Sequence, residues 1–147
     1  MDLRLDALLP SFQKIERHSE LMIRANYFLL ELIKAYDLQN NPEIIRTASE
    51  FSDWIMDATE AELPYKIRLL NKLQIVKRQR SLNAEERKLL YNLIIDPTSS
   101  NDILTAAYLL LGEQSLAKDH FEELDNQVQH EFKTYPIYHL WQDNITE

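Results

Sequence analysis

The longest amphipathic pattern along the chain covers residues 12–38. One series of positions recurs every seven residues, and a second series lies three positions later. The first comprises Ile15, Met22, Leu29 and Tyr36, and the second comprises His18, Ala25 and Leu32. Such a double series forms the a/d seam of a coiled coil or the buried stripe of a long helix. We therefore expect a helix over 12–38 whose seam lies in the core of the domain, with a homodimer seam as the alternative.

Shorter amphipathic segments follow, and each lies between turn-forming residues. Helices are expected over 43–60, 65–79, 84–95 and 126–132. Asn83 and Glu86 have the spacing of a capping box, with Asn in place of the usual Ser or Thr, so one of these helices is expected to begin at residue 84. The segment 96–101 is rich in Pro, Thr, Ser and Asn, and it predicts a loop.

Residues 102–111 and 114–124 are expected to form a pair of helices that turn at Gly112. A large apolar residue, an aromatic residue, a small residue, an alanine and a second aromatic residue follow one another at set intervals, namely Leu104, Tyr108, Gly112, Ala117 and Phe121. On these residues the stretch 104–124 resembles a single tetratricopeptide-repeat-like hairpin. No second copy of the motif lies one repeat length earlier, because Arg78 stands 34 residues before Gly112, where a second copy would have its small residue. The resemblance implies a superhelical array, and the alternative is a hairpin within a compact helical bundle.

Composition supports an all-helical chain. Its 147 residues include one glycine, and tight β-hairpin turns usually need glycine for positive φ. The five prolines are widely spaced and lie at expected helix boundaries. We therefore expect an all-α fold of about six to eight helices, stacked as antiparallel hairpins in one helical domain over residues 1–147.

Charge is distributed unevenly along the chain. The net charge is −8, yet residues 66–88 contain eight of the sixteen Lys and Arg side chains. This basic segment predicts a contact surface for an acidic region of another protein. The proposed contact residues are Lys72, Lys77, Arg78, Arg80, Arg87 and Lys88. Internal ion pairs and the negative end of the helix dipole offer a structural alternative for part of the cluster. Nucleic acid is not expected as a partner for so acidic a chain.

A second candidate contact lies near the C-terminus, where aromatic residues flank Pro136. Tyr135, Tyr138 and Trp141 are residue types that are common at the centres of protein interfaces. The alternative is that this segment packs back onto the core.

The sequence shows no convincing catalytic, cofactor or metal site. There is no cysteine, no Glu-x-x-His or His-Glu-x-x-His motif, and no glycine-rich phosphate loop. No apolar run reaches the roughly 20 residues that span a membrane, so we expect a cytoplasmic protein that does not enter the bilayer. The function expected is a non-catalytic protein–protein interaction module, such as an adaptor or regulatory subunit. One alternative is a small acidic inhibitor that mimics nucleic acid. Another is a helical hydrolase or nuclease using His120 or His130.

Overall fold

The computed structural model describes residues 17–141, and helices are the only regular elements in this range. Seven α-helices and one short 3-10 helix are described, which confirms the all-α fold predicted from the sequence. The chain divides into two compact units, residues 1–79 and residues 80–147. Each unit is described by itself below. The single helical domain expected over residues 1–147 stays a prediction.

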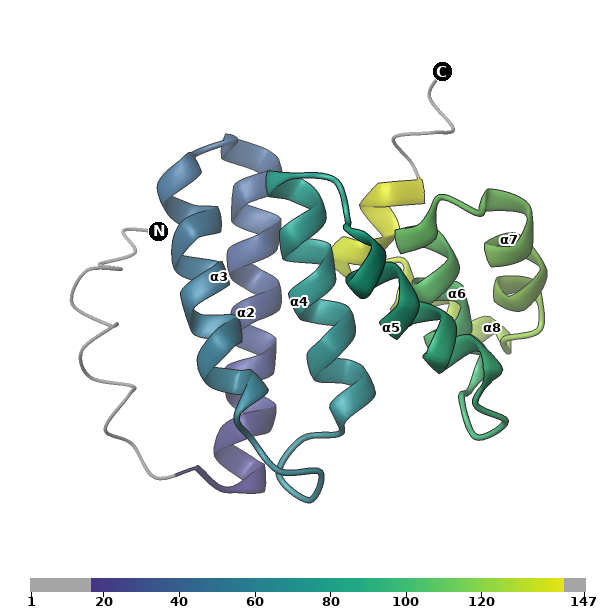
Figure 1. The fold of residues 1–147 in the computed structure, drawn as a ribbon, viewed down its shortest axis with the longest axis horizontal. Helices are drawn as coiled ribbons and strands as arrows, with labels where there is room; N and C mark the ends of the chain where they lie inside the picture. The colour runs from purple at the N-terminus through teal and green to yellow at the C-terminus, as the bar shows by residue number, and fades with distance from the viewer. Residues whose placement is uncertain (1–16, 142–147) are drawn as a thin grey trace. The chain divides into compact units, whose positions relative to one another are not determined.

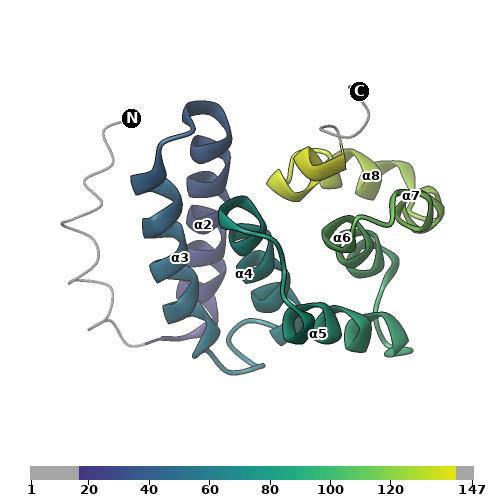
Figure 2. The ribbon, with the colours of Figure 1, turned by 45° about the horizontal axis from the view of Figure 1, so that its top comes forward.

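The first unit contains three long helices. They are α2 (Ser19–Gln39), α3 (Pro42–Met56) and α4 (Tyr65–Gln79). Both views of the ribbon show them side by side, with α3 packed against its two neighbours (Figures 1 and 2). The core between them is apolar, and Met22, Leu29, Ile33, Ile55 and Leu73 are almost completely buried. The buried residues of α2 and α3 recur mainly at three- and four-residue spacing, so each of these two helices buries one face, whereas α4 has buried residues on most of its sides between Arg68 and Val76.

The turn from α2 to α3 is fixed by two asparagines. Asn40 has a φ of 52° in the left-handed region, and its N–H donates to the carbonyl oxygen of Tyr36 at 2.6 Å. Asn41 then caps α3, because its side-chain oxygen accepts the N–H of Glu43 at 2.9 Å. Pro42 begins the helix at the position where its missing N–H has no intrahelical partner.

Two predicted helix boundaries in the first unit were wrong. Residues 12–16 lie outside the described residues, and α2 begins at Ser19 because the extended residue His18 caps it through Nδ1. The helix predicted over 43–60 ends at Met56. Thr59 and Glu62 follow it in a reciprocal arrangement, in which the Glu62 carboxylate accepts the N–H of Thr59 and the Thr59 hydroxyl accepts the N–H of Glu62. The spacing of these two residues is itself a capping-box signal, and it was missed.

The second unit consists of shorter helices. They are α5 (Ala84–Ile95), α6 (Asn101–Leu111), α7 (Gln114–Glu122), α8 (Asn126–Phe132) and the 3-10 helix η1 (Pro136–Tyr138). Helix α6 packs against α5, α7 and η1, so it is the centre of this unit. Leu109 and Leu110 of α6 are almost completely buried, as the central position requires.

Gly112 makes the tight turn between α6 and α7. Its φ is 78°, and the N–H of the next residue, Glu113, donates back to the carbonyl oxygen of Tyr108 at 2.9 Å. Ala117 is completely buried, which lets α7 approach α6 closely. The predicted helical pair around Gly112 is therefore confirmed, with α7 ending at Glu122. A tetratricopeptide-like array stays a prediction.

No helix between residues 17 and 141 is long and apolar enough to cross a membrane.

Candidate interaction surfaces

Arg78 makes an internal ion pair within the first unit. Its Nε and one terminal nitrogen donate to the two carboxylate oxygens of Asp37 at 2.7 and 2.8 Å. The other terminal nitrogen donates to the carbonyl oxygen of Gln74 at 2.9 Å. Only 7% of the Arg78 side chain is exposed, so this arginine joins α4 to α2. A bidentate pair of this kind fixes both charge and geometry.

Arg78 also ends a row of polar side chains along α4. Gln74, which is buried, accepts from Arg78 and donates to Asn71 at 3.0 Å. Asn71 in turn donates to the side-chain oxygen of Asn26 on α2 at 2.6 Å. Buried polar groups with satisfied hydrogen bonds fix how two helices align, because a slipped alignment would leave them unpaired. The row is therefore best explained as a structural feature of the first unit.

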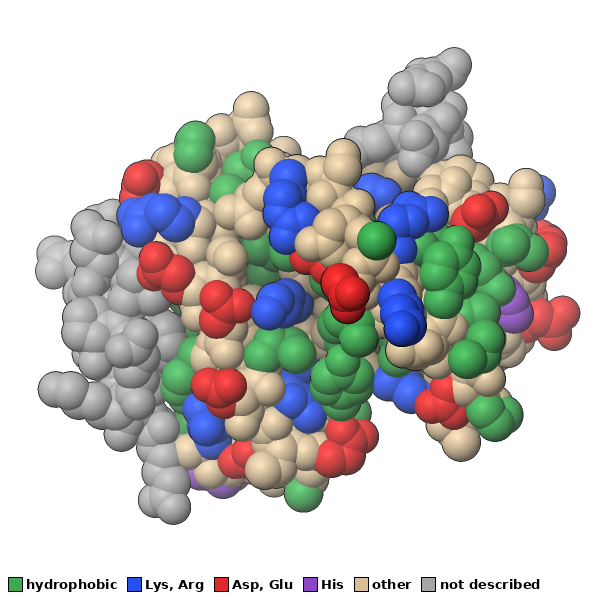
Figure 3. Space-filling view, in the orientation of Figure 1, with side chains coloured by type: hydrophobic (Ala, Val, Ile, Leu, Met, Phe, Trp, Pro, Cys, Tyr) green, Lys and Arg blue, Asp and Glu red, His purple; other side chains and the backbone are tan. Residues whose placement is uncertain are grey.

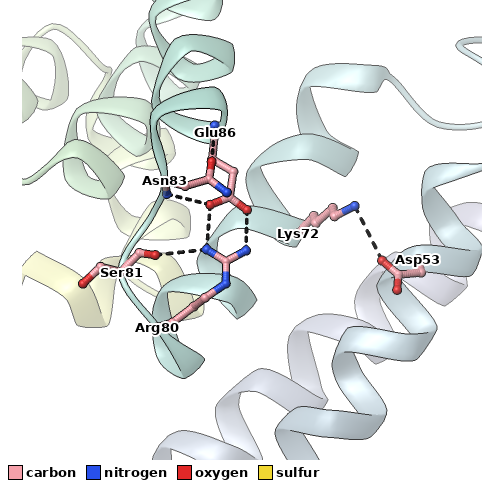
Figure 4. Close-up of polar contacts among 6 residues, drawn as sticks. All are labelled: Asp53, Lys72, Arg80, Ser81, Asn83 and Glu86. Atoms are coloured by element: carbon pink, nitrogen blue, oxygen red, sulfur yellow. Dashed lines mark hydrogen bonds and ion pairs between the residues drawn. The ribbon is translucent and has the colours of Figure 1, made fainter.

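The two other basic residues predicted on α4 are engaged differently. The ammonium of Lys72 lies 3.6 Å from the carboxylate of Asp53 on α3, and both side chains are exposed (Figure 4). Exposed pairs of this kind contribute little, about 0–1 kcal/mol. Lys77 lies in the last turn of α4, where the helix dipole favours a cation.

Arg80, in the second unit, is tied to the start of α5. Its two terminal nitrogens each donate to one carboxylate oxygen of Glu86 at 2.8 Å (Figure 4). The same carboxylate accepts the N–H of Asn83, whose side chain accepts the N–H of Glu86, so the predicted capping box is confirmed. Hydrogen bonding to Glu86 raises the pKa of Arg80 above its ordinary value. Arg80 thus stabilises a helix start.

Arg87 and Lys88 differ from the other four predicted basic residues. Within residues 17–141, the side chain of neither one forms a hydrogen bond or an ion pair. Both lie one turn into α5, far from the C-terminal end at which the helix dipole favours cations. The internal ion pairs that explain Arg78 and Arg80 do not apply to these two residues. The helix dipole that explains Lys77 does not apply to them either. Their charges are available to a partner.

Exposed apolar side chains follow these two cations along α5. Leu90 and Leu93 are the buried residues of this helix, so the opposite side carries Lys88, Tyr91 and Ile95 at helical spacing. Tyr91 is 44% exposed and Ile95 is 76% exposed. We call Lys88, Tyr91 and Ile95, together with the partly buried Arg87 at their edge, the α5 outer face. Figure 3 shows basic and hydrophobic side chains next to one another over α5.

The sequence analysis did not single out Tyr91 and Ile95. Two other apolar residues of this helix are not fully buried either, since Leu89 is exposed and Ile94 is only partly buried. One feature of the sequence could have indicated this exposure. Apolar residues lie around most of the circumference of α5, and a helix that buries one face leaves some of them exposed.

The predicted aromatic contact is mostly folded into the second unit. Phe121 is the hub, because the ring of Trp141 lies 5.2 Å and that of Tyr138 lies 6.3 Å from its ring. Tyr135 packs edge-on against Phe132 at 6.2 Å, and Phe132 is itself buried. Tyr135, Tyr138 and Trp141 are all partly buried. These contacts give the three aromatic residues a structural role, and a partner contact at this end stays a prediction.

The two histidines considered for catalysis are far from equivalent. His120 stacks on Tyr108 with ring centroids 5.5 Å apart, and its Nδ1 lies 3.0 Å from the side-chain oxygen of Asn101. His130 is exposed in the last turn of α8. Among the described residues, no group of three His, Asp or Glu side chains is arranged to hold a metal ion.

The acidic side chains of the first unit are mostly paired. Seven of the nine carboxylates between residues 17 and 79 lie within 4.0 Å of a Lys or Arg nitrogen. A protein that mimics the backbone of nucleic acid needs rows of unpaired negative charge. This pairing argues against such a role for the first unit.

Comparison with known proteins adds no family assignment. The chain matches no protein-family model, and no curated protein or solved structure is significantly similar to it.

Proposed function

We propose that this chain is a non-catalytic protein–protein interaction module, an adaptor or regulatory subunit, and that the α5 outer face binds an acidic surface of its partner. The observation that carries the proposal is that the side chains of Arg87 and Lys88 form no hydrogen bond or ion pair within residues 17–141 and lie beside exposed Tyr91 and Ile95. The sequence analysis grouped six basic residues, and the proposal keeps two of them because their side chains form no internal pair within residues 17–141.

The composition of the α5 outer face supports the proposal. Arginine and tyrosine are frequent among the residues that contribute most to protein interfaces. An isoleucine that is 76% exposed loses water contact when a partner covers it, and burial of such a side chain stabilises by about 1.5–3 kcal/mol. Helix α6 packs behind α5 and provides a rigid support for this face.

Charge reversal tests the proposal. The double variant Arg87→Glu/Lys88→Glu should lower partner capture at least tenfold, because two attractive contacts become repulsive. The matched control is Arg24→Glu/Lys118→Glu, which changes net charge by the same amount and alters exposed side chains on α2 and α7. Tagged wild-type and variant proteins would be used to capture partners from the native host, and captured proteins would be quantified by mass spectrometry.

The comparison between variants decides the result. A partner that is retained by the control and lost by Arg87→Glu/Lys88→Glu supports the proposal. A partner captured equally by both variants would reject the α5 outer face as its contact surface. Raising the salt concentration should weaken the specific capture, because exposed charges are screened over about 8–10 Å.

A further inference from the structure

The α5 outer face has an order along the helix that restricts its occupant. Lys88 lies nearer the start of α5, Tyr91 follows three positions later, and Ile95 follows four positions after that. Seven residues of helix separate Lys88 from Ile95, which corresponds to about 10 Å. A partner must therefore place negative charge at one end and an apolar surface at the other end of a strip of this length.

The structural elements around this strip favour a helical occupant. Between residues 17 and 141 no strand exists, so there is no sheet edge to which an extended segment could add through backbone hydrogen bonds. Side chains spaced by three and four residues form a ridge, and such ridges fit the grooves of another helix. An amphipathic helix covers Tyr91 and Ile95 with its apolar side and reaches the two cations with flanking carboxylates.

Other classes of partner fit the strip less well. A nucleic acid or an anionic lipid surface would find two unpaired cations on this face, but the chain as a whole carries a net charge of −8. Such a partner would be repelled by the acidic chain at long range, or it would leave Ile95 without an apolar surface to contact. A second copy of the chain would carry the same net charge of −8. A short acidic segment with apolar residues meets the local charge and the exposed apolar surface together.

We propose, building on the proposed function, that the α5 outer face receives an acidic amphipathic helix. Its carboxylates pair with Arg87 and Lys88, and its large apolar side chains cover Tyr91 and Ile95. The occupant is a helical segment of another protein, and the α5 outer face acts as one side of a helix–helix contact.

Two synthetic peptides of about 18 residues test the proposal, since this length allows several helical turns. Both have leucines at positions i, i+3, i+4 and i+7. One carries glutamates beside this stripe and the other carries lysines at the same positions. Each is titrated into the full ¹⁵N-labelled chain, and backbone amide shifts are followed by NMR. The glutamate peptide should shift amides concentrated in residues 84–95, and the lysine peptide should bind at least tenfold more weakly.

Two variants locate the contact. Ile95→Glu removes the exposed apolar side chain without touching the buried side of α5, and it should weaken the glutamate peptide at least tenfold. Lys118→Glu should leave its affinity within a factor of two. Binding by neither peptide, equal binding by both, or shifts outside α5 would each overturn the acidic-helix proposal. If a host partner still depends on Arg87 and Lys88 in that case, the proposed function stands and only the class of occupant is wrong.

Self-association is checked on the same samples by sedimentation. A chain that dimerises through Ile95, with dimers lost in Ile95→Glu, would show that a second copy occupies the face and would likewise overturn the proposal. Monomeric protein with the shift pattern described above supports it.

Discussion

The two units use charge in opposite ways. In the first unit, carboxylates between residues 17 and 79 are mostly neutralised by nearby Lys or Arg, as Asp37 is by Arg78. In the second unit, Glu86 pairs with Arg80, but six other carboxylates form no hydrogen bond or ion pair with the described residues. These are Glu85, Glu113, Asp119, Glu122, Glu123 and Glu131. The first unit therefore pairs most of its carboxylates internally, within helices and between them, whereas the second leaves six of its carboxylates without a partner among the described residues.

The two units also differ in the side chains that form their cores. The second unit is held together around an aromatic hub at Phe121, which three rings approach within 6.3 Å. The first unit combines an aliphatic core with the polar row from Asn26 to Arg78. The predictions below test this contrast, from the largest expected effect to the smallest.

The largest effect is expected at the aromatic hub. Phe121→Ala should destabilise the second unit by about 3–5 kcal/mol, because Phe121 is 8% exposed and its removal leaves a cavity between α7, α8 and Trp141. The measurement is urea unfolding, with hydrogen exchange by mass spectrometry to follow each unit separately. Leu116→Ala on the same helix is the control, and its exposed side chain should cost less than about 1 kcal/mol. Equal losses in the two variants would contradict the role of Phe121 as a hub.

A smaller effect is expected at the internal ion pair of the first unit. Arg78→Ala should destabilise that unit by about 2 kcal/mol, since it leaves Asp37 and Gln74 without their charged donor in a partly buried position. Lys72→Ala breaks only an exposed pair and should cost less than about 1 kcal/mol. Denaturant unfolding of the two variants gives the comparison. If both variants lost the same free energy of unfolding, the ion pair of Arg78 would contribute no more than an exposed pair, and Arg78 would again be a candidate for contact with a partner.

The smallest effect is a pH dependence at Glu62. The backbone hydrogen bond from Thr59 is the main cause that lowers the pKa of Glu62 below 4.5, so the folded state holds this carboxyl in its charged form. The resulting stabilisation is present above the unfolded-state pKa and is lost as the pH falls through the lowered folded-state value. Glu62→Gln should flatten this part of the stability profile, measured by thermal unfolding from neutral to acidic pH. Thr59→Ala keeps the N–H donor and should retain most of the pH dependence.

The sequence predicted local structure better than it predicted contacts. The helices over 65–79, 84–95 and 126–132 have the predicted bounds, because the signals for them are local: Pro64 precedes the first, and the capping residues Asn83 and Asp125 precede the other two. The start of α2 was missed because His18 fits the heptad pattern but acts as a cap. The aromatic positions near the C-terminus were recognised, but their packing on Phe121 depends on how the chain folds back.

The candidate site was predicted in part, for a physical reason. Arg87 and Lys88 were among the six basic residues selected, but so was Arg78, whose partner Asp37 lies 41 residues away along the chain. No local pattern reveals a pair at that separation. The exposure of Tyr91 and Ile95 likewise depends on which side of α5 meets α6, because apolar residues surround this helix.

The two left-handed residues have a consequence for which substitutions the chain can accept. Asn40 and Gly112 carry the positive φ values among residues 17–141, and each reverses the chain between two helices. A Cβ atom at Gly112 would meet no atom within 4 Å, so backbone strain of about 1–2 kcal/mol is the main opposition to a Cβ-bearing residue there. If both positions are randomised in a library of variants, the variants that still fold should therefore be those whose residues tolerate a positive φ, whatever the size of their side chains. Glycine and asparagine should interchange at both positions, while valine and isoleucine should disappear from them.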